Sequence, residues 1–336
     1  MFDMYRNVGR SQQFCSGTIM DNDKIPYYKA NRLLRKWARC EGIEGCEIAH
    51  DAKLSMMRRL FMPVSARLIE QWFAGALNYS PTDRDEALCI NQEGQPYPPD
   101  MYDMKSVKLE WVLKYPRAQA QYNALQQRER LTTPRAVESL RRCLSRVRMT
   151  DTTIDALALC NGNLAELHKR FQFQFAGVES TFGQKLDEFI LQRLTNSGLP
   201  DDLTGALGSF NIYAAVAYAE FDRDARHATI TSIYLYVRDN YTFSDRTGEQ
   251  SQYLGHWNHK RVVLVPATGA AGIAGIRWLD YPVVAEGKRS RGNIYYPVRN
   301  KSFREWQLRH RRGGDFVIFS DYRCVTLPEP IEIEFS

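Results

Sequence analysis

The feature that most constrains the fold is a change in the period of the hydrophobic residues partway along the chain. From Pro63 to about residue 150, apolar side chains recur every three to four positions, the spacing of one face of an α-helix. Beyond about residue 168 they alternate with polar residues, as on a half-buried strand. We therefore predict an α+β fold, in which a helical N-terminal subdomain precedes a mainly antiparallel β-rich C-terminal domain.

Three helical segments are predicted in the first half, with a loop rich in Pro, Asp and Gly at residues 79–104. Proline at the first helical position costs nothing, since its missing N–H has no partner there, but an interior proline breaks or kinks a helix. The predicted segments are Pro63–Asn78, Val107–Arg130 with a break or kink at Pro116, and a helix that begins at Thr133–Pro134.

The second half is predicted to be mostly strands, with two helices among them. Phe316–Phe319 is nearly all apolar, so we expect this strand to be buried on both faces. The other predicted strands are Phe171–Phe175, Asn211–Phe221, Ala228–Val237, Val262–Val265 and Asn293–Val298, and the helices are Phe182–Leu194 and Phe303–His310.

The domain organisation follows from these patterns. Residues 1–55 are polar and mixed, and we interpret them as a partly ordered leader. Residues 56–150 would form the helical subdomain, and residues 165–336 the β-rich domain that carries the candidate site.

Composition limits the class of protein. Forty-four per cent hydrophobic and 25% charged residues are typical of a globular chain, and a net charge of +6 over 336 residues is mild. Seven scattered cysteines fit free thiols in a reducing compartment better than disulfides or a zinc site, so no metal site is predicted. With no apolar signal and no stretch long enough to span a bilayer, we expect a protein made in the cytoplasm, with any export by a specialised route.

The strongest candidate for chemistry is the polar segment from Val237 to Arg261. Asp239 and Tyr241 are two residues apart, so they would share a face of the strand, and His256 follows on the same segment. A carboxylate, a phenol, an imidazole and a cation could together act on a phosphate ester. The alternative is a hairpin with structural turn contacts. The candidate catalytic residues are Asp239, Tyr241, His256 and Asp321, and the candidate substrate-binding residues are Arg238, Arg261 and Arg304.

Asp321 joins this set because it follows the buried strand Phe316–Phe319. It could approach Asp239 if the two strands are neighbours. The alternative is that Asp315 and Asp321 only bound that strand as turn residues.

Residues 286–312 form the most basic stretch of the chain. Such a stretch could meet nucleic acid, lipid headgroups, a diphosphate or an acidic protein, and the alternative is a solvated charged face. The sequence contains no HExxH, GxSxG, Walker or GxGxxG motif, and it indicates no particular cofactor.

The order of several blocks resembles an uncharacterised proteobacterial domain family whose genes often lie beside those of type VI secretion spike proteins. The blocks are MPVSARLIEQWF (Met62–Phe73), SVKLEWVLKYPRA (Ser106–Ala118), FGQKLDE (Phe182–Glu188), IYLYVRDNYTF (Ile233–Phe243), QYLGHWN (Gln252–Asn258) and FREWQLRHRRGGDFVIFSD (Phe303–Asp321). The resemblance implies an antibacterial effector with a cognate immunity protein, or an adaptor that binds spike proteins.

A shorter stretch is similar to the Asp-x-Tyr-Asp-Phe motif of colicin M-type lipid II hydrolases. Asp239, Tyr241 and Phe243 match, but Thr242 stands at the second aspartate and the His-Arg step has no clean counterpart. Three functions follow as hypotheses: a secreted toxin that hydrolyses a lipid-linked or other phosphate ester, a non-enzymatic adaptor, and a nucleic-acid binding or cleaving protein.

Overall fold

The computed structural model describes residues 62–148, 152–179, 201–245, 248, 250–257, 262–263, 282–284 and 294–335. The proposed leader, the helix predicted at Phe182–Leu194, and Arg261 lie outside these residues. Contacts divide the chain into two compact units, each built from two stretches of sequence. Unit 1 comprises Met1–Pro96 and Thr242–Asp315, and unit 2 comprises Tyr97–Tyr241 and Phe316–Ser336.

This division differs from the consecutive domains expected from the sequence. The helices between residues 97 and 148 belong to the same unit as the large sheet, because helices in this segment pack on that sheet. Conversely, the C-terminal half contributes to both units, since residues 242–315 belong to unit 1.

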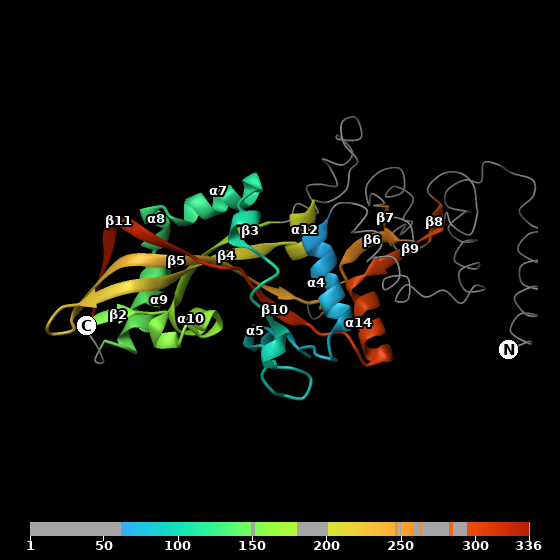
Figure 1. Ribbon diagram of the computed structural model, residues 1–336, viewed down its shortest axis with the longest axis horizontal. Coiled ribbons are helices and arrows are strands. Elements are labelled where there is room, and N and C mark those ends of the chain that lie inside the picture. The colour runs from blue at the N-terminus through green and yellow to red at the C-terminus, as the bar shows by residue number, and fades with distance from the viewer. Residues whose placement is uncertain are drawn as a thin grey trace, which may run out of the picture. The chain divides into compact units, whose positions relative to one another are not determined.

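The core of unit 2 is a seven-stranded sheet built around the long strand β5 (His227–Tyr241) (Figure 1). One edge of β5 pairs with β4 (Phe210–Phe221), and the other is shared by β10 (Phe316–Phe319) and β11 (Arg323–Glu334). The far edge of β4 is shared by β3 (Gln172–Val178) and β2 (Thr153–Asp155). All these pairings are antiparallel, and only β1 (Tyr102–Asp103) is added in parallel, to β10, so the predicted α+β class is confirmed.

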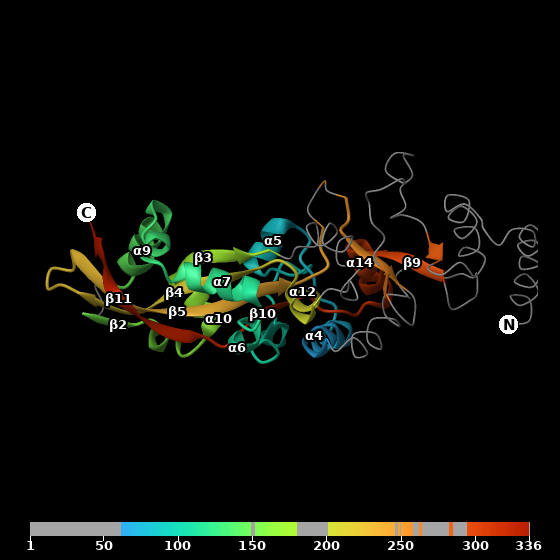
Figure 2. The same cartoon turned by 90° about the horizontal axis from the view of Figure 1, so that it is seen from above.

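Helices cover both faces of this sheet. Figure 2 shows α7 (Pro116–Leu125) above the strands, while α10 (Leu164–Phe171) lies below them in Figure 1. On α7, Tyr122 meets Arg323, the strand partner of Leu235, whereas His168 of α10 bonds the neighbouring Tyr236. Successive strand residues point to opposite faces, so the two helices cover opposite sides of β5.

The predicted second helix is divided by its proline. The structure has α6 (Leu109–Val112), α7, and α8 (Arg128–Leu131) in place of one helix, with Pro116 as the first residue of α7. The preceding Tyr115 is extended, as expected before proline. The third helix is confirmed as α9 (Pro134–Ser145), where the Thr133 hydroxyl accepts a hydrogen bond from the N–H of Ala136.

The strand predicted at Phe171–Phe175 begins one residue later than expected. Phe171 is the last residue of α10, which starts after an Asn163 side chain that accepts bonds from two backbone N–H groups. The pairing of β3 with β4 shifts between Gln172 and Gln174. Phe173 is buried, but Phe175 is 55% exposed.

The strand β11 was not predicted, although Leu327, Ile331 and Ile333 are all buried. Pro328 and Pro330 obscure its alternation, and prolines fit here because β11 pairs only with β5 and therefore lies at the edge of the sheet. The pairing with β5 shifts between Thr326 and Ile331, where these prolines lie. Unit 2 also contains short helices at Pro99–Met101 and Ala158–Cys160 and α12 (Asp202–Leu207).

Unit 1 is built on the aromatic contacts of two helices, α4 (Pro63–Ala74) and α14 (Asn300–His310). Trp72 and Phe73 of α4 contact Phe303 and Trp306 of α14, and Phe243 stacks on Phe303 with ring centroids 3.9 Å apart. This burial confirms the apolar faces predicted for both helices.

The remaining elements of unit 1 are α5 (Asp83–Leu88) and a small sheet. The sheet has the order β7 (Val262–Val263), β6 (Tyr253–Trp257), β9 (Ile294–Arg299) and β8 (Val283–Val284). Gly313 follows α14 with φ at +93°, and a Cβ there would lie 3.1 Å from the Trp72 ring, so this turn requires glycine.

Candidate functional site

Asp239 and Tyr241 lie on one face of β5, as predicted from their spacing. Tyr241 is buried and stacks on Phe316 with ring centroids 4.9 Å apart. Burial, followed by the charge of Asp239, raises the pKa of the Tyr241 phenol well above its usual value. Tyr241 is therefore neutral in the physiological range and is not a source of phenolate for catalysis.

Arg238 lies on the opposite face of the sheet from Asp239. Its strand partners are Asn211 on β4 and Phe319 on β10, whereas Asp239 is opposite Ile318. The Arg238 guanidinium also acts on His168 of α10, which is on the Tyr236 side of the sheet. The predicted pairing of Arg238 with Asp239 around one substrate is therefore not formed.

Asp321 has a structural partner. The strands β10 and β5 are neighbours, as the sequence argument required. However, Oδ1 of Asp321 accepts a hydrogen bond from the N–H of Leu109 at 2.6 Å, at the start of α6. The first N–H groups of a helix have no partner within the helix, so this carboxylate acts as a cap supplied from a distant part of the chain.

His256 belongs to unit 1 and is completely buried in β6. Its Nδ1 shares a hydrogen bond with the Tyr253 hydroxyl, three residues earlier on the same strand. A fully buried imidazole fixed in this way is a core residue of its sheet.

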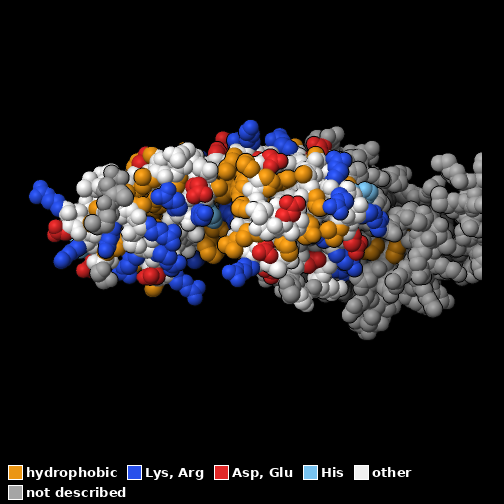
Figure 3. Space-filling model, turned by 90° about the horizontal axis from the view of Figure 1, so that it is seen from below, with side chains coloured by type: hydrophobic (Ala, Val, Ile, Leu, Met, Phe, Trp, Pro, Cys, Tyr) orange, Lys and Arg blue, Asp and Glu red, His pale blue; other side chains and the backbone are white. Residues whose placement is uncertain are grey.

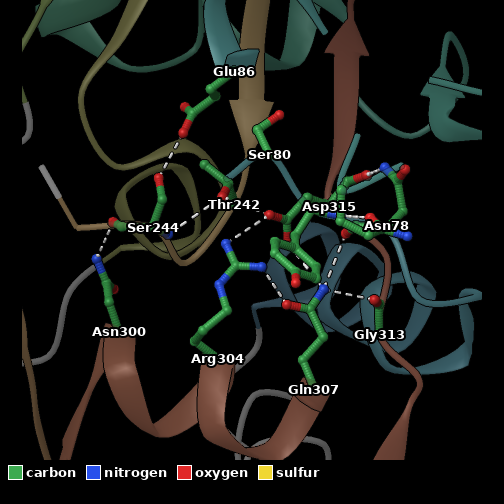
Figure 4. Close-up of polar contacts among 12 residues, drawn as sticks. Asn78, Ser80, Glu86, Thr242, Ser244, Asn300, Arg304, Gln307, Gly313 and Asp315 are labelled. Carbon is green, nitrogen blue, oxygen red and sulfur yellow. Dashed lines mark hydrogen bonds and ion pairs between the residues drawn. The ribbon is translucent and has the colours of Figure 1, made fainter. Parts of the chain in front are cut away.

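Arg304 is held by Asp315, and both residues belong to a buried polar network of unit 1 (Figure 4). Nη2 of Arg304 lies 3.0 Å from Oδ2 of Asp315, Nη1 donates to Oε1 of Gln307, and the guanidinium lies over the Tyr79 ring. Arg304 therefore supports the fold of unit 1, where the sequence predicted a phosphate contact.

Asp315 is the centre of this network and is 1% exposed. Oδ1 accepts a hydrogen bond from Nε1 of Trp72 at 2.8 Å, and Oδ2 accepts one from the Thr242 hydroxyl at 2.8 Å. With Arg304, three donors of different elements converge on one carboxylate. A buried charge is tolerated only with such bonding, so Asp315 links α4, α14 and the segment at residue 242.

Main-chain contacts around Asn78 extend the network, as Figure 4 shows. Nε2 of Gln307 donates to the carbonyl groups of Asn78 and Gly313, and the Asn78 amide donates to the carbonyl of Asp315 at 2.6 Å. At the edge of this region, the Ser244 hydroxyl bonds Glu86, and Asn300 bonds the Ser244 carbonyl.

Sequence reasoning missed His168, the most perturbed imidazole of unit 2. Its Nδ1 lies 2.9 Å from the Tyr236 hydroxyl, and its ring meets Tyr213 edge-on at 4.7 Å. Burial, followed by the charge of Arg238, lowers the pKa of His168 to about 3. Its spacing from Leu164, Leu167 and Phe171 on the apolar face of α10 could have identified it as a histidine that packs on a core.

Only part of the predicted basic stretch is available as a surface. Arg299 is buried, donates to the Ser251 carbonyl and lies over the Tyr253 ring. With Arg304 also engaged, the exposed cations among the described residues of this stretch are Lys301, Arg309, Arg311 and Arg312 on or just after α14.

Two further properties were examined across the described part of the chain. Among those residues, no three His, Cys, Asp or Glu side chains gather in a way that could hold a metal ion. No helix in the same residues has the length and apolar character needed to cross a bilayer.

The fold and these contacts define an α+β protein of two units in which most of the predicted site residues have structural partners. The chain belongs to a family of unknown function, DUF6402, whose family model matches residues 54–335. No curated protein and no solved structure matches it. The expected uncharacterised family is confirmed at this level.

Proposed function

We propose that this protein acts as a non-enzymatic adaptor, which binds an acidic partner protein. The observation that carries the proposal is the placement of the candidate catalytic groups in unit 2. Arg238 and Asp239 lie on opposite faces of β5, and Asp321 is used to cap α6. Catalysis requires such groups to converge on one reacting centre.

Unit 1 supports the same conclusion through its basic residues. Arg299 and Arg304 are tied to the fold, but Lys301, Arg309, Arg311 and Arg312 remain exposed, and Leu308 among them is 50% exposed. A basic surface with an exposed apolar side chain is suited to an acidic partner protein, because charge steers the encounter and the apolar contact adds affinity. The resemblance to a family encoded beside type VI secretion genes makes spike proteins the first partners to test.

The first experiment expresses the chain in a host bacterium, once in the cytoplasm and once with an added periplasmic signal. An adaptor should not inhibit growth in either compartment, and Asp239→Ala should change nothing. Growth arrest in one compartment, lost in Asp239→Ala with an unchanged circular dichroism spectrum, would instead establish a toxin that uses Asp239, as in the phosphate-ester hypothesis.

The second experiment measures binding to a purified spike protein encoded beside this gene. We expect the triple variant Lys301→Ala/Arg309→Ala/Arg312→Ala to weaken the complex by roughly tenfold. The control, Lys105→Ala/Lys108→Ala/Lys114→Ala, removes the same charge from exposed lysines of unit 2 and should bind like the wild type. Equal losses in both variants would show that net charge alone drives association.

A further inference from the structure

A second basic surface lies in unit 2, on α8 and α9. Between Arg128 and Arg148 the chain has seven arginines, two glutamates and no lysine. Figure 3 shows Lys and Arg side chains gathered on this side of the molecule, the side on which α9 and α10 lie in Figure 1. This concentration of arginine stood outside the basic stretch predicted from the sequence.

Some of these arginines are engaged with the fold. Nη1 of Arg128 donates to the carbonyl groups of Glu329 and Pro330, and Nε of Arg141 donates to the carbonyl of Glu334. These bonds cover carbonyl groups of the edge strand β11. Arg148 lies over the Phe335 ring at 5.4 Å.

Three arginines of this surface have no such role. Arg135, Arg142 and Arg146 are exposed, and none forms an ion pair or a side-chain hydrogen bond with a described residue. They are seven and four residues apart, so they fall within about 40° around the helix and form one line along α9 and its C-terminal cap. The spacing along the axis is roughly 10 Å and 6 Å. We name this line the arginine stripe.

The surroundings of the arginine stripe indicate what it would bind. The exposed neighbours Glu138, Arg141 and Ser145 are polar, so α9 has no apolar side chains here to insert into a membrane. Guanidinium groups bind phosphate oxygens through two parallel hydrogen bonds, and a row of them matches a polymer with regularly repeated charges. Lys169 of the neighbouring α10 is also exposed and adds positive charge.

We propose that the arginine stripe Arg135–Arg142–Arg146 binds the phosphate backbone of a nucleic acid without reading its sequence. This activity goes beyond the adaptor function and uses a different unit of the chain. Phosphate contacts of this kind give affinity through counterion release, and they fix position without specifying bases.

The test is fluorescence anisotropy with the full chain, using a labelled DNA duplex of mixed sequence, at sodium chloride concentrations from 50 to 300 mM. Each phosphate contact adds about 0.9 to the slope of log affinity against log salt, so Arg135→Ala/Arg142→Ala/Arg146→Ala should lower that slope by about two to three. Its affinity at 100 mM salt should fall by roughly tenfold or more. A second duplex of unrelated sequence should bind equally well.

The charge-matched control is again Lys105→Ala/Lys108→Ala/Lys114→Ala, which should bind DNA like the wild type. All three arginines are exposed and alanine favours helix, so the variant should keep the wild-type circular dichroism spectrum. A wild-type slope in the arginine variant would overturn the proposal, as would an equal loss in the lysine control. Tighter binding to polyglutamate or to vesicles containing anionic phospholipid than to DNA would also overturn it, by assigning the stripe to an acidic protein or a membrane. Spike-protein binding through α14 would be unaffected in each case, so failure here is distinguishable from failure of the adaptor proposal.

Discussion

At the scale of single residues, the central feature is the Asp315 carboxylate, which accepts hydrogen bonds from Trp72, Thr242 and Arg304 in unit 1. Asp315→Asn would present an amide to these donors and leave the Arg304 charge uncompensated. We expect it to lower the free energy of unfolding by about 3 kcal/mol.

Urea denaturation of the purified chain measures this loss. Trp72→Phe removes one donor and should cost less, about 1 kcal/mol. If Asp315→Asn were no more costly than Trp72→Phe, the network would not be the polar centre that its geometry indicates.

A pH dependence follows from His168, because its pKa of about 3 in the folded protein is far below that of an unfolded histidine. Below about pH 6.5 the unfolded state takes up a proton that the native state does not, so stability falls as the pH decreases until the folded pKa is reached. The loss from this residue should be about 2 kcal/mol between pH 7.5 and pH 5.

The measurement compares urea denaturation of the wild type and His168→Gln at both pH values. Glutamine keeps a hydrogen-bonding group near Tyr236 but does not titrate, so the variant should show less acid destabilisation by that amount. Identical pH dependence in the two proteins would contradict the prediction.

At the scale of elements, capping residues decide where helices begin. Thr133 caps α9 through its hydroxyl, and Pro134 occupies the first helical position. Thr133→Ala should lower the free energy of unfolding by about 1 kcal/mol, whereas Thr133→Ser should retain nearly all of it. Thermal unfolding followed by circular dichroism measures both, and equal stability of the two variants would show that the cap contributes little.

Local signals such as this cap explain which elements could be predicted. The helices at Pro63 and Thr133 and the buried strand Phe316–Phe319 depend on neighbouring residues, and all three were found. The strand β11 was missed because its pairing with β5 tolerates prolines that would exclude a central strand. Whether a segment lies at the edge of a sheet is not a local property of its sequence.

The candidate site was harder to predict than the fold for a similar reason. The spacing of Asp239 and Tyr241 correctly placed them on one face, but the residue between candidate partners is as important as the partners themselves. Arg238 is adjacent to Asp239 in sequence and therefore points to the other side of the sheet. The capping role of Asp321 depends on Leu109, more than two hundred residues away, which no local pattern encodes.

At the scale of the whole molecule, the chain passes between the two units three times, after Pro96, Tyr241 and Asp315. Tyr241 and Phe316 are direct partners in the register of β5 and β10. The segment Thr242–Asp315 is therefore inserted where a hairpin turn would otherwise connect the two strands.

This topology makes unit 2 separable by design. Residues 97–241 joined to residues 316–336 through Asn-Gly, a dipeptide suited to two-residue hairpins, should give a soluble protein with cooperative thermal unfolding. The control, residues 97–241 alone, leaves one edge of β5 without a partner and should aggregate. Aggregation of both proteins would mean that unit 2 depends on the inserted segment for its fold.

The position of β10 and β11 at the end of the chain also determines the order of events on the ribosome. β5 is complete once Tyr241 is made, but the strands that cover its second edge begin only at Phe316. Translation proceeds at about 5–20 residues per second, so this edge waits on the order of ten seconds for its partners. Nascent chains should consequently be most prone to association during that interval, when the longest strand of the protein has one edge open to solvent.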